Sequence, residues 1–408
     1  MNIKNNLSHS ADISLTAELS IPINGNNIID FKKLARLYKD ELLDNVLPFW
    51  LEHSQDNEYG GYFTCLDRDG RVFDTDKFIW LQGREVWMFS MLYNKVEKRQ
   101  EWLDCAILGG EFLKKYGHNG NYNWYFSLDR SGRPLVEPYN IFSYTFAAMA
   151  FGQLSLATGN QEYADIAKKT FDIILSKVDN PKGKWNKLHP GTRNLKNFAL
   201  PMILCNLAME IEHILGKDYL EQAMDTCIHE VMSVFYRPEL GGIIVENVDV
   251  NGNLIDCFEG RQITPGHAIE AMWFIMDLGK RLNRPELIEK AKNITLTMLE
   301  YGWDKEYGGI YYFMDRNGCP PQQLEWDQKL WWVHIETLIS LLKSYQLTGD
   351  NQCLEWFEKV HDYTWTHFKD KEHPEWYGYL NRRGEVLLPL KGGKWKGCFH
   401  VPRGLYQC

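Results

Sequence analysis

The chain has 408 residues, of which 44% are hydrophobic, so it can bury a large core and by length alone allows two or three domains. Its net charge of −9 comes from interspersed acidic and basic residues, which disfavours a nucleic-acid partner and predicts an ordinary soluble surface. No run approaches the ~18 apolar residues of a membrane span, and no N-terminal signal pattern is present. The nine cysteines are scattered without a Cys-x-x-Cys pair, so we expect reduced thiols and a cytoplasmic location.

The first 96 residues introduce four kinds of segment. Residues 1–28 are rich in Asn, Ser and Ile and show no helical period, so we expect a loosely ordered extension followed by one domain over residues 29–408. Apolar residues recur at three- and four-residue steps over Asp30–His53, which predicts an amphipathic helix. The phrase EYGGYFTCLDRDG at Glu58–Gly70 predicts a β-hairpin, because it combines paired glycines with an Asp-x-x-Gly turn. Phe78–Val96 is apolar on most sides and predicts a buried helix.

The same order of amphipathic helix, hairpin and apolar helix recurs along the chain. Further amphipathic helices are predicted at Glu101–Tyr116, Glu162–Val178, Tyr219–Phe235, Pro285–Tyr301 and Asn351–Phe368. Further apolar helices are predicted at Ile141–Ala157, Phe198–Ile214, Gly266–Leu282 and Lys329–Leu347, with a short last helix beginning near Cys398. Further hairpin phrases stand at Asn123–Gly132, Glu239–Gly252, Glu306–Gly318 and Glu375–Gly384. Apolar helices belong inside and amphipathic helices outside, which predicts two concentric rings.

The spacing of the hairpin turns gives the number of units. The first turn residues are Asp67, Asp129, Asp249, Asp315 and Asn381, at steps of 62, 120, 66 and 66 residues. The long step is close to two short ones, so one unit is degraded near Lys187–Arg193, and six units are expected. The sequence therefore predicts an all-α (α/α)6 barrel with short β-hairpins on one side. An open solenoid would show the same alternation, but no polar capping repeat is visible.

Polar residues stand out in the first turns of the apolar helices, on the hairpin side. They are Trp80 and Arg84; Ser143 and Tyr144; His267 and Glu270; Trp332, His334 and Glu336; and His400 and Arg403. Counted from the turn residues, Arg84, His267, His334 and His400 lie 17 to 19 positions on, so we expect them at one level around the barrel mouth. Glu336 and His334 are two residues apart and cannot both point inward. We place Glu336 inward, because it lies one turn after Trp332.

These residue types indicate proton-transfer chemistry, because buried charges are costly unless they are paired or used. Two imidazoles on facing helices, His267 and His400, can remove a proton from one face of a carbon and return it on the other. Arg84 or Arg403 can stabilise the negative oxygen that forms next to a carbonyl. An isomerase or epimerase of an aldose fits this set.

Other interpretations stay open at this point. Glu270 and Glu336 can hold imidazole tautomers or bind sugar hydroxyls, but they can also serve a glycosidase as acid and base. Trp80 and Trp332 offer stacking faces for a sugar, and a purely structural polar belt is a further alternative. A tri-His metal site is disfavoured, because the histidines come from three helices without a metal-type spacing, so no metal is expected.

Four stretches make the chain resemble the N-acylglucosamine 2-epimerase family, also known in animals as renin-binding protein. They are PGHAIE at Pro265–Glu270, WWVHIE at Trp331–Glu336, KGGKWKGCFHVPR at Lys391–Arg403 and, more weakly, GTRNLKNFALPMIL at Gly191–Leu204. The likeness runs from about Ile29 to the last residue. Cellobiose 2-epimerases and aldose–ketose isomerases share the barrel and the His-x-x-Glu element. They differ at the position of His334 and around the last histidine, which favours the N-acetylglucosamine branch.

The resemblance implies interconversion of N-acetyl-D-glucosamine and N-acetyl-D-mannosamine, by deprotonation and reprotonation at C2 of the open-chain sugar. It carries over His267 and His400 as the acid/base pair, with Arg84, Glu270, Glu336 and Arg403 as supporting site residues. Together with the residue pattern, this predicts that His267, His400, Glu336 and Arg84 are catalytic and that the substrate is bound by Trp80, Glu270, Trp332, His334 and Arg403. The resemblance also implies a homodimer and ATP as an activator that is not consumed. The alternatives are a mannose-type aldose–ketose isomerase, a cellobiose-type 2-epimerase and, outside enzymes, a protein-binding scaffold. Because the chain ends five residues after Arg403, a short twelfth helix is expected.

Overall fold

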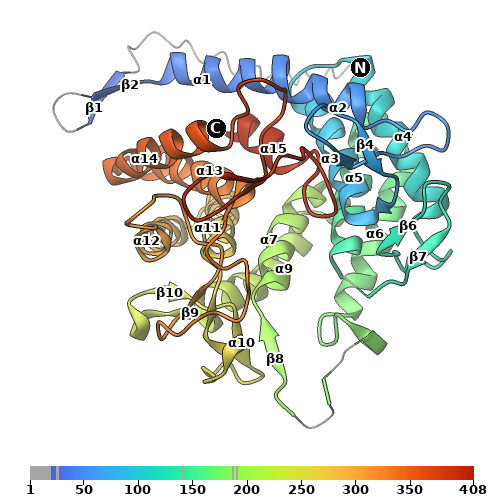
Figure 1. The fold of residues 1–408 in the computed structure, drawn as a ribbon. Coiled ribbons are helices and arrows are strands. Elements are labelled where there is room, and N and C mark those ends of the chain that lie inside the picture. The colour runs from blue at the N-terminus through green and yellow to red at the C-terminus, as the bar shows by residue number, and fades with distance from the viewer. Residues whose placement is uncertain (1–19, 24–26, 140, 186–187, 190–191) are drawn as a thin grey trace, which may run out of the picture.

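Helices in two concentric rings make up the molecule (Figure 1). The computed structural model describes residues 20–23, 27–139, 141–185, 188–189 and 192–408. The inner ring contains α3 (Ile79–Lys95), α5 (Ile141–Thr158), α7 (Ala199–Glu210), α11 (Pro265–Arg281), α13 (Trp331–Thr348) and α15 (His400–Gln407). The outer ring contains α1 (Phe31–Asp40) with α2 (Leu47–His53), then α4 (Gln100–Tyr116), α6 (Gln161–Ser176), α9 (Lys217–His229), α12 (Pro285–Gly302) and α14 (Asn351–His367). Short helices α8 (Glu212–Leu215) and α10 (Phe258–Arg261) lie between them in sequence.

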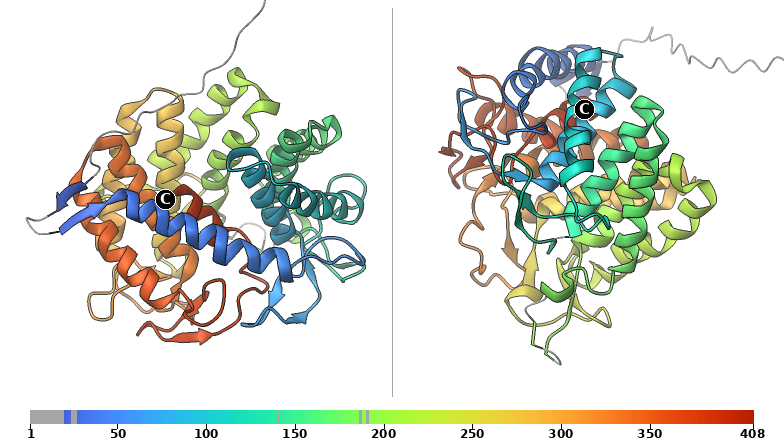
Figure 2. Two further views of the ribbon diagram at one scale, coloured as in Figure 1. Left: turned by 90° about the horizontal axis from the view of Figure 1, so that it is seen from above. Right: turned by 90° about the vertical axis from the view of Figure 1, so that its right-hand side faces the viewer.

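The N-terminal segment adds a hairpin and a long rod. Strands β1 (Ser20–Ile23) and β2 (Asn27–Asp30) pair antiparallel, while residues 1–19 and 24–26 of the predicted extension lie outside the described residues. The Asp30 carboxylate caps α1 by accepting the Lys33 N–H at 3.0 Å. A π-helical segment, Glu41–Val46, joins α1 to α2, so the single predicted helix is one rod. This rod crosses the C-terminal helix α15 (Figure 2, left).

The repeated turns share one geometry. In each of the five, the glycine N–H donates to the carbonyl of the residue three positions earlier, at 3.0 or 3.1 Å. The glycines are Gly70, Gly132, Gly252, Gly318 and Gly384, with φ between +72° and +94°. A side chain is strained at such φ values, so the sequence needs glycine there.

Short strands tie each unit to the next. The strand before an inner helix pairs antiparallel with the following unit's turn segment. The pairs are β5 (Lys77–Phe78) with β6 (Ser127–Leu128), β8 (Leu195–Asn197) with β11 (Asn247–Asp249), β12 (Gln262–Ile263) with β13 (Met314–Asp315), and β14 (Lys329–Leu330) with β15 (Tyr379–Leu380). Other pairs are β3 (Cys65–Leu66) with β4 (Val72–Asp74), β6 with β7 (Pro134–Val136), β9 (Tyr236–Arg237) with β10 (Ile243–Ile244), and β15 with β16 (Val386–Leu388).

The hairpins differ among the units. Those at Asp67, Asp129 and Asn381 have a second strand after the turn, as predicted. The turns at Asp249 and Asp315 are followed by irregular chain, so the prediction of complete hairpins there is wrong. After Asp315 the reason is visible in the sequence Cys-Pro-Pro, since proline has no N–H to donate to a strand partner. Of the degraded unit, residues 186–187 and 190–191 lie outside the described residues.

Ionic triplets of a buried aspartate, a buried lysine and a partly exposed arginine, which we call Asp–Lys–Arg clasps, join adjacent units. In the first, Asp56 accepts hydrogen bonds from Lys77 Nζ at 2.9 Å and from Arg130 Nε at 3.0 Å. Burial raises the pKa of Asp56, but the bonds from Arg130 and Lys77 outweigh it and bring this pKa to about 2. The lysine comes from the same unit as the aspartate, whereas the arginine follows the turn residue of the next unit. The arginine that follows the turn residue of the repeated phrase therefore joins adjacent units.

Two more clasps repeat this arrangement. In the second, Asp304 binds Lys329 at 3.1 Å and Arg382 at 3.0 Å. In the third, Asp370 in the last unit binds Lys391 and, from the first unit, Arg68, both at 2.7 Å. The third clasp therefore connects the two ends of the repeat.

Further contacts close the ring between the first and last units. The Leu66 carbonyl accepts the N–H groups of Lys391 and Gly392 at 3.0 and 3.1 Å. The Trp50 indole donates to Glu375 at 2.7 Å. The structure is thus a closed (α/α)6 barrel, which confirms the predicted fold class and excludes the open solenoid. No helix within the described residues is long and apolar enough to cross a membrane.

Candidate active site

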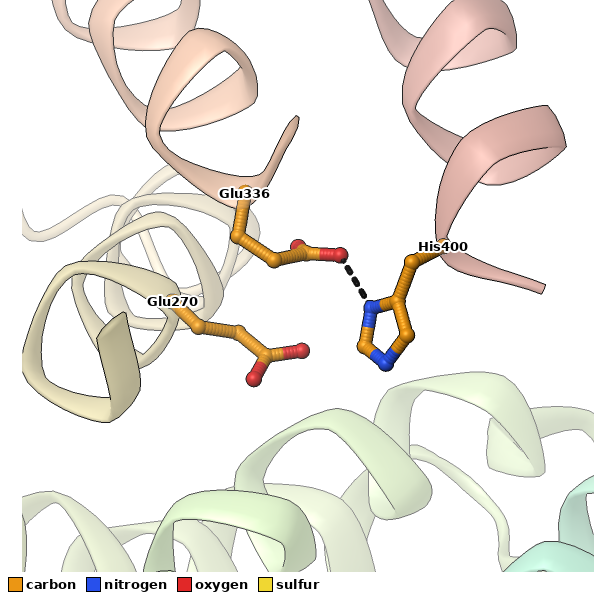
Figure 3. Close-up of side chains that lie close together, drawn as sticks. All are labelled: Glu270, Glu336 and His400. Atoms are coloured by element: carbon orange, nitrogen blue, oxygen red, sulfur yellow. Dashed lines mark hydrogen bonds and ion pairs between the residues drawn. The ribbon is translucent and has the colours of Figure 1, made fainter. Parts of the chain in front are cut away.

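The first turns of α11, α13 and α15 bring Glu270, Glu336 and His400 together (Figure 3). All three side chains are buried and turned toward one another. Glu336 is at the centre of their hydrogen bonds, since its Oε1 accepts from His400 Nδ1 at 2.7 Å and from Arg403 at 2.6 Å. Its Oε2 accepts from the indole of Trp273 at 2.9 Å. With three donors on one carboxylate, the orientation of Glu336 is well determined.

Arg403 completes this cluster. One guanidinium nitrogen donates to both Glu270 and Glu336 at 2.6 Å. Burial lowers the pKa of Arg403, but the two carboxylates outweigh it, so the pKa is raised and the charge is retained. Glu270, Glu336 and His400 could each offer a ligand atom to a metal ion. The Arg403 cation already lies on both carboxylates, so the donor set does not fit a second cation.

His400 is held as a neutral imidazole with a defined tautomer. A carboxylate only accepts hydrogen bonds, so the contact with Glu336 places the ring proton on Nδ1 and the lone pair on Nε2. Burial lowers the pKa of His400 well below its usual value, and the nearby positive charges of Arg84 and Arg403 lower it further. A neutral imidazole with a free Nε2 is a general base.

His267 lies in the opposite electrostatic environment. Its Nδ1 lies 3.2 Å from both carboxylate oxygens of Glu246. Burial lowers the pKa of His267, but Glu246, together with Glu270, raises it by more, so the net shift is upward. The Trp332 indole lies against both histidines, with ring centroids 5.3 Å from His267 and 5.9 Å from His400. Two imidazoles with different charge preferences thus lie on one aromatic side chain.

Arg84 is a partly buried cation whose neighbours are rings. Its guanidinium lies 4.7 Å from the Trp80 ring, 4.1 Å from Phe146 and 4.8 Å from Phe399. Burial, with a smaller repulsion from Arg403, lowers its pKa to about 9. Within the described residues, Arg84 Nε and Trp80 Nε1 are buried donors without a hydrogen-bond partner. Arg84 therefore carries its charge without a carboxylate partner among the described residues.

The structure places His334 away from this cluster. Its Nδ1 donates to the Leu330 carbonyl at 2.7 Å, and its Nε2 accepts the Ile310 N–H at 3.0 Å. The ring stacks on Tyr363 of α14, and burial lowers its pKa to about 3. Both nitrogens are occupied, so this position does not support the predicted role in substrate binding. The expectation that Glu336 and not His334 takes the inward face agrees with this arrangement.

Sequence analysis missed Glu246 and Trp273. Glu246 lies in the repeated hairpin phrase, three positions before the turn residue Asp249. At that position the other units carry Thr64, Phe126, Tyr312 and Gly378. The only carboxylate among five equivalent positions was therefore a usable signal. Trp273 had no such signal, because an indole in an apolar helix is an ordinary core residue.

Comparison with known proteins identifies the family. The sequence profile of the N-acylglucosamine 2-epimerase (GlcNAc 2-epimerase) family matches residues 61–402. N-acylglucosamine 2-epimerases of Mus musculus and Homo sapiens are each 41% identical to the chain, over 378 and 376 residues. The matches cover 90% of this chain and 90% and 87% of these relatives. The chain belongs to the N-acylglucosamine 2-epimerase family. The resemblance found in the sequence is confirmed.

Two solved structures support the fold. A cellobiose 2-epimerase from Bacillus thermoamylovorans B4167 superposes with a TM-score of 0.80 at 21% identity, covering 92% of this chain and 98% of that one. A D-mannose isomerase superposes with a TM-score of 0.79 at 18% identity, covering 92% and 97%. At these identities the similarity establishes the architecture alone.

Proposed function

We propose that this member of the N-acylglucosamine 2-epimerase family interconverts N-acetyl-D-glucosamine and N-acetyl-D-mannosamine at C2 of the open-chain sugar. The observation that supports this most is the pair of imidazoles, His267 and His400, which both lie against the Trp332 ring. Each Nδ1 contacts a carboxylate, and neither Nε2 has a hydrogen-bond partner within the described residues. The 41% identity to N-acylglucosamine 2-epimerases supports the choice of sugar.

The proposed reaction needs one proton removed from C2 and one returned to the opposite face. Removal moves the C2–H electron pair toward the C1 carbonyl, which becomes an enolate oxygen. Arg84 carries a positive charge that no carboxylate contacts within the described residues, which suits this oxygen.

The arrangement of the carboxylates argues against a glycosidase. A glycosidase needs two carboxyl groups on opposite sides of the bond that is cleaved. Here Glu270 and Glu336 accept hydrogen bonds at 2.6 Å from the same nitrogen of Arg403. A sugar cannot be inserted between them without breaking that pairing. We therefore assign both carboxylates to holding Arg403 and His400.

A deuterium-exchange assay tests the proposed function. The protein is incubated with N-acetyl-D-mannosamine in D₂O, and the products are followed by proton NMR. We expect N-acetyl-D-glucosamine that carries deuterium at C2. Absence of exchange at C2, with ketose formed from mannose, would support the aldose–ketose isomerase and overturn the proposal. Cellobiose and mannose, run in parallel, separate the cellobiose-type alternative.

We also propose a homodimer that is activated by ATP without consuming it, as family membership suggests. Activation is tested by adding ATP or a non-hydrolysable analogue and measuring turnover and nucleotide hydrolysis together. Size-exclusion chromatography with light scattering gives the assembly state. A cytoplasmic location is proposed from the nine free cysteines, which suit a reducing compartment.

A further inference from the structure

Glu246 is a buried carboxylate placed behind one of the two histidines. It lies between β10 and β11, outside the inner helices that carry the other active-site residues. Its side chain is 6% exposed, and both its oxygens lie 3.2 Å from His267 Nδ1. The Asn197 amide also donates to it at 3.3 Å. A buried carboxylate needs a partner of positive charge or several donors, and a protonated His267 meets that need.

The carboxylate behind His400 is in a different situation. Glu336 is shared among His400, Arg403 and Trp273, so its negative charge is already compensated by the Arg403 cation. No arginine or lysine contacts Glu246 through its side chain within the described residues. Of the two pairs, only His267–Glu246 therefore depends on the histidine for its positive charge.

The groups that face His267 come from several elements. Glu246 comes from the β10–β11 segment, Glu270 from the same helix, and the Trp332 ring from α13. His400 on α15 is close enough for the two imidazoles to repel when both are protonated. The His267 side chain keeps 29% exposure, so it can exchange protons with solvent. Two carboxylates and one neutral imidazole favour the charged form of His267.

We propose that Glu246 is a positioning residue that makes His267 the proton donor of the resting enzyme and leaves His400 as the base. This inference rests on the proposed two-base reaction and adds its direction. His400 Nε2 takes the C2 proton, and the electron pair moves to the carbonyl oxygen as an enolate. His267 Nε2–H then gives its proton to the other face of C2. His400 releases its proton and His267 regains one from solvent, which restores the starting state.

The first test is the pH dependence of kcat/KM in Glu246→Gln. The glutamine keeps the shape and an acceptor for Nδ1–H but removes the charge. Because the carboxylate raises the pKa of His267, its loss lowers that pKa and moves the basic limb of the profile to lower pH. The pH profiles of kcat/KM for the two directions of epimerisation shift together, because the ratio of the two kcat/KM values equals the equilibrium constant between the two sugars, which is fixed. On the basic side, kcat/KM falls about 100-fold, the usual order for losing a general acid.

Matched variants separate charge from local structure. Glu259 lies on the following short helix and is exposed, so Glu259→Gln makes the same change without touching His267. This variant should keep the wild-type profile. Glu246→Asp retains the negative charge and should restore the basic limb, even if kcat falls. An unshifted basic limb in folded Glu246→Gln, or an equal shift in Glu259→Gln, overturns the proposal.

The second test compares the rate of deuterium exchange at C2 with the rate of epimer formation. In D₂O, Glu246→Gln should still release the C2 proton to His400 but reprotonate the other face slowly. Deuterium should therefore appear in recovered substrate faster, relative to epimer formation, than in the wild type. This applies to the epimer whose C2–H faces His400. An unchanged ratio for both epimers contradicts the assigned direction.

An NMR titration of ring-labelled histidines needs no variant that might fail to fold. In the wild-type protein, His267 should be protonated at a pH where His400 is neutral, with assignments from His267→Asn and His400→Asn. The reverse order overturns the inference even if the enzyme epimerises the proposed sugar. Absence of C2 exchange by the wild type, with the expected titration order, overturns the proposed function instead.

Discussion

The Asp–Lys–Arg clasps and the active-site cluster both bury charges, but they treat them differently. In each clasp an aspartate receives a lysine and an arginine, and the ion pairs are closed by hydrogen bonds of 2.7 to 3.1 Å. In the active site, Arg84 is surrounded by rings and keeps an unpaired Nε. The clasps therefore compensate their charges within the protein, whereas the Arg84 guanidinium has no carboxylate partner within the described residues.

This difference gives a way to separate structural from catalytic residues in one repeat. A clasp residue should affect unfolding and leave turnover by the folded protein intact. An active-site residue should affect turnover and leave unfolding nearly unchanged. Four substitutions test whether the two regions are as distinct as their geometry suggests.

The largest effect is expected for His400→Asn. Asparagine can occupy the Nδ1 position toward Glu336, but it has no base at the Nε2 position. Turnover should fall by at least about 1000-fold, within the range for an essential acid–base group. Thermal unfolding should change little. His229→Asn, at an exposed histidine of α9, is the control and should behave as wild type. Turnover surviving His400→Asn would remove this residue from the chemistry.

Asp370→Asn should break the clasp that closes the ring. Lys391 is fully buried there and loses its charged partner, and removal of one member of a buried pair costs about 3–5 kcal/mol. Urea unfolding measures this loss, and the specific activity of the folded fraction should stay near wild type. Asp67→Asn removes a partly exposed partner of Arg71 and should have no measurable effect. Equal stabilities of these two variants would contradict the structural role of the clasp.

Arg84→Met should lower turnover without lowering stability, which is the opposite of the effect expected for Asp370→Asn. No carboxylate loses a hydrogen bond, and a desolvated cation is removed, so stability in urea should stay equal or rise. Turnover should fall about 100-fold, as is typical for the loss of one group that stabilises an oxyanion. A destabilisation as large as that of Asp370→Asn would show that Arg84 belongs with the structural charges.

His334→Phe should give a moderate structural effect. The Ile310 N–H loses its acceptor, which costs ~1–3 kcal/mol, while turnover by the folded protein is retained. Burial lowers the pKa of His334 to about 3, so the unfolded chain takes up a proton that the folded protein refuses. Wild-type stability therefore falls as the pH drops from about 6.5 toward 3, by up to ~1.4 kcal/mol per unit from this group.

The phenylalanine variant should lose less stability over that pH range than the wild type. Urea unfolding at several pH values measures the difference. A loss of turnover comparable to that of His400→Asn would instead return His334 to the active site.

Much of the fold could be predicted from the sequence, because the same pattern recurs in each unit. The interpretation of one unit therefore supports that of the others. The paired glycines and the Asp-x-x-Gly turn recur with a near-constant step, and every glycine turn has the expected backbone geometry. Incomplete hairpins after Asp249 and Asp315 were not predicted, because the pattern of the other units was extended to segments whose partner strands are absent. After Asp315, Pro320 and Pro321 indicated that a second strand would not form.

The candidate site was predicted less completely. Its level along the inner helices was correct for Arg84, His267 and His400, because distance from the turn measures height in the barrel. The count does not give the face of the helix; the spacing from Trp332 favoured Glu336 as the inward residue, and the structure places both His334 nitrogens on backbone groups. Glu246 was missed, because it lies on the hairpin segment that the repeat had marked as structural.

The sequence by itself determined the six-unit ring, the inner and outer helices, the family and the histidine pair, since these depend on local periodicity and motifs. Only the tertiary structure decided how charges separated by many residues are paired. Arg68 meets Asp370 across the closure, and Glu246 meets His267 from a neighbouring segment. Such pairs depend on distances between elements, which no spacing within one helix encodes. The charge of each histidine follows from those pairs, so the direction proposed for proton transfer comes from the folded molecule.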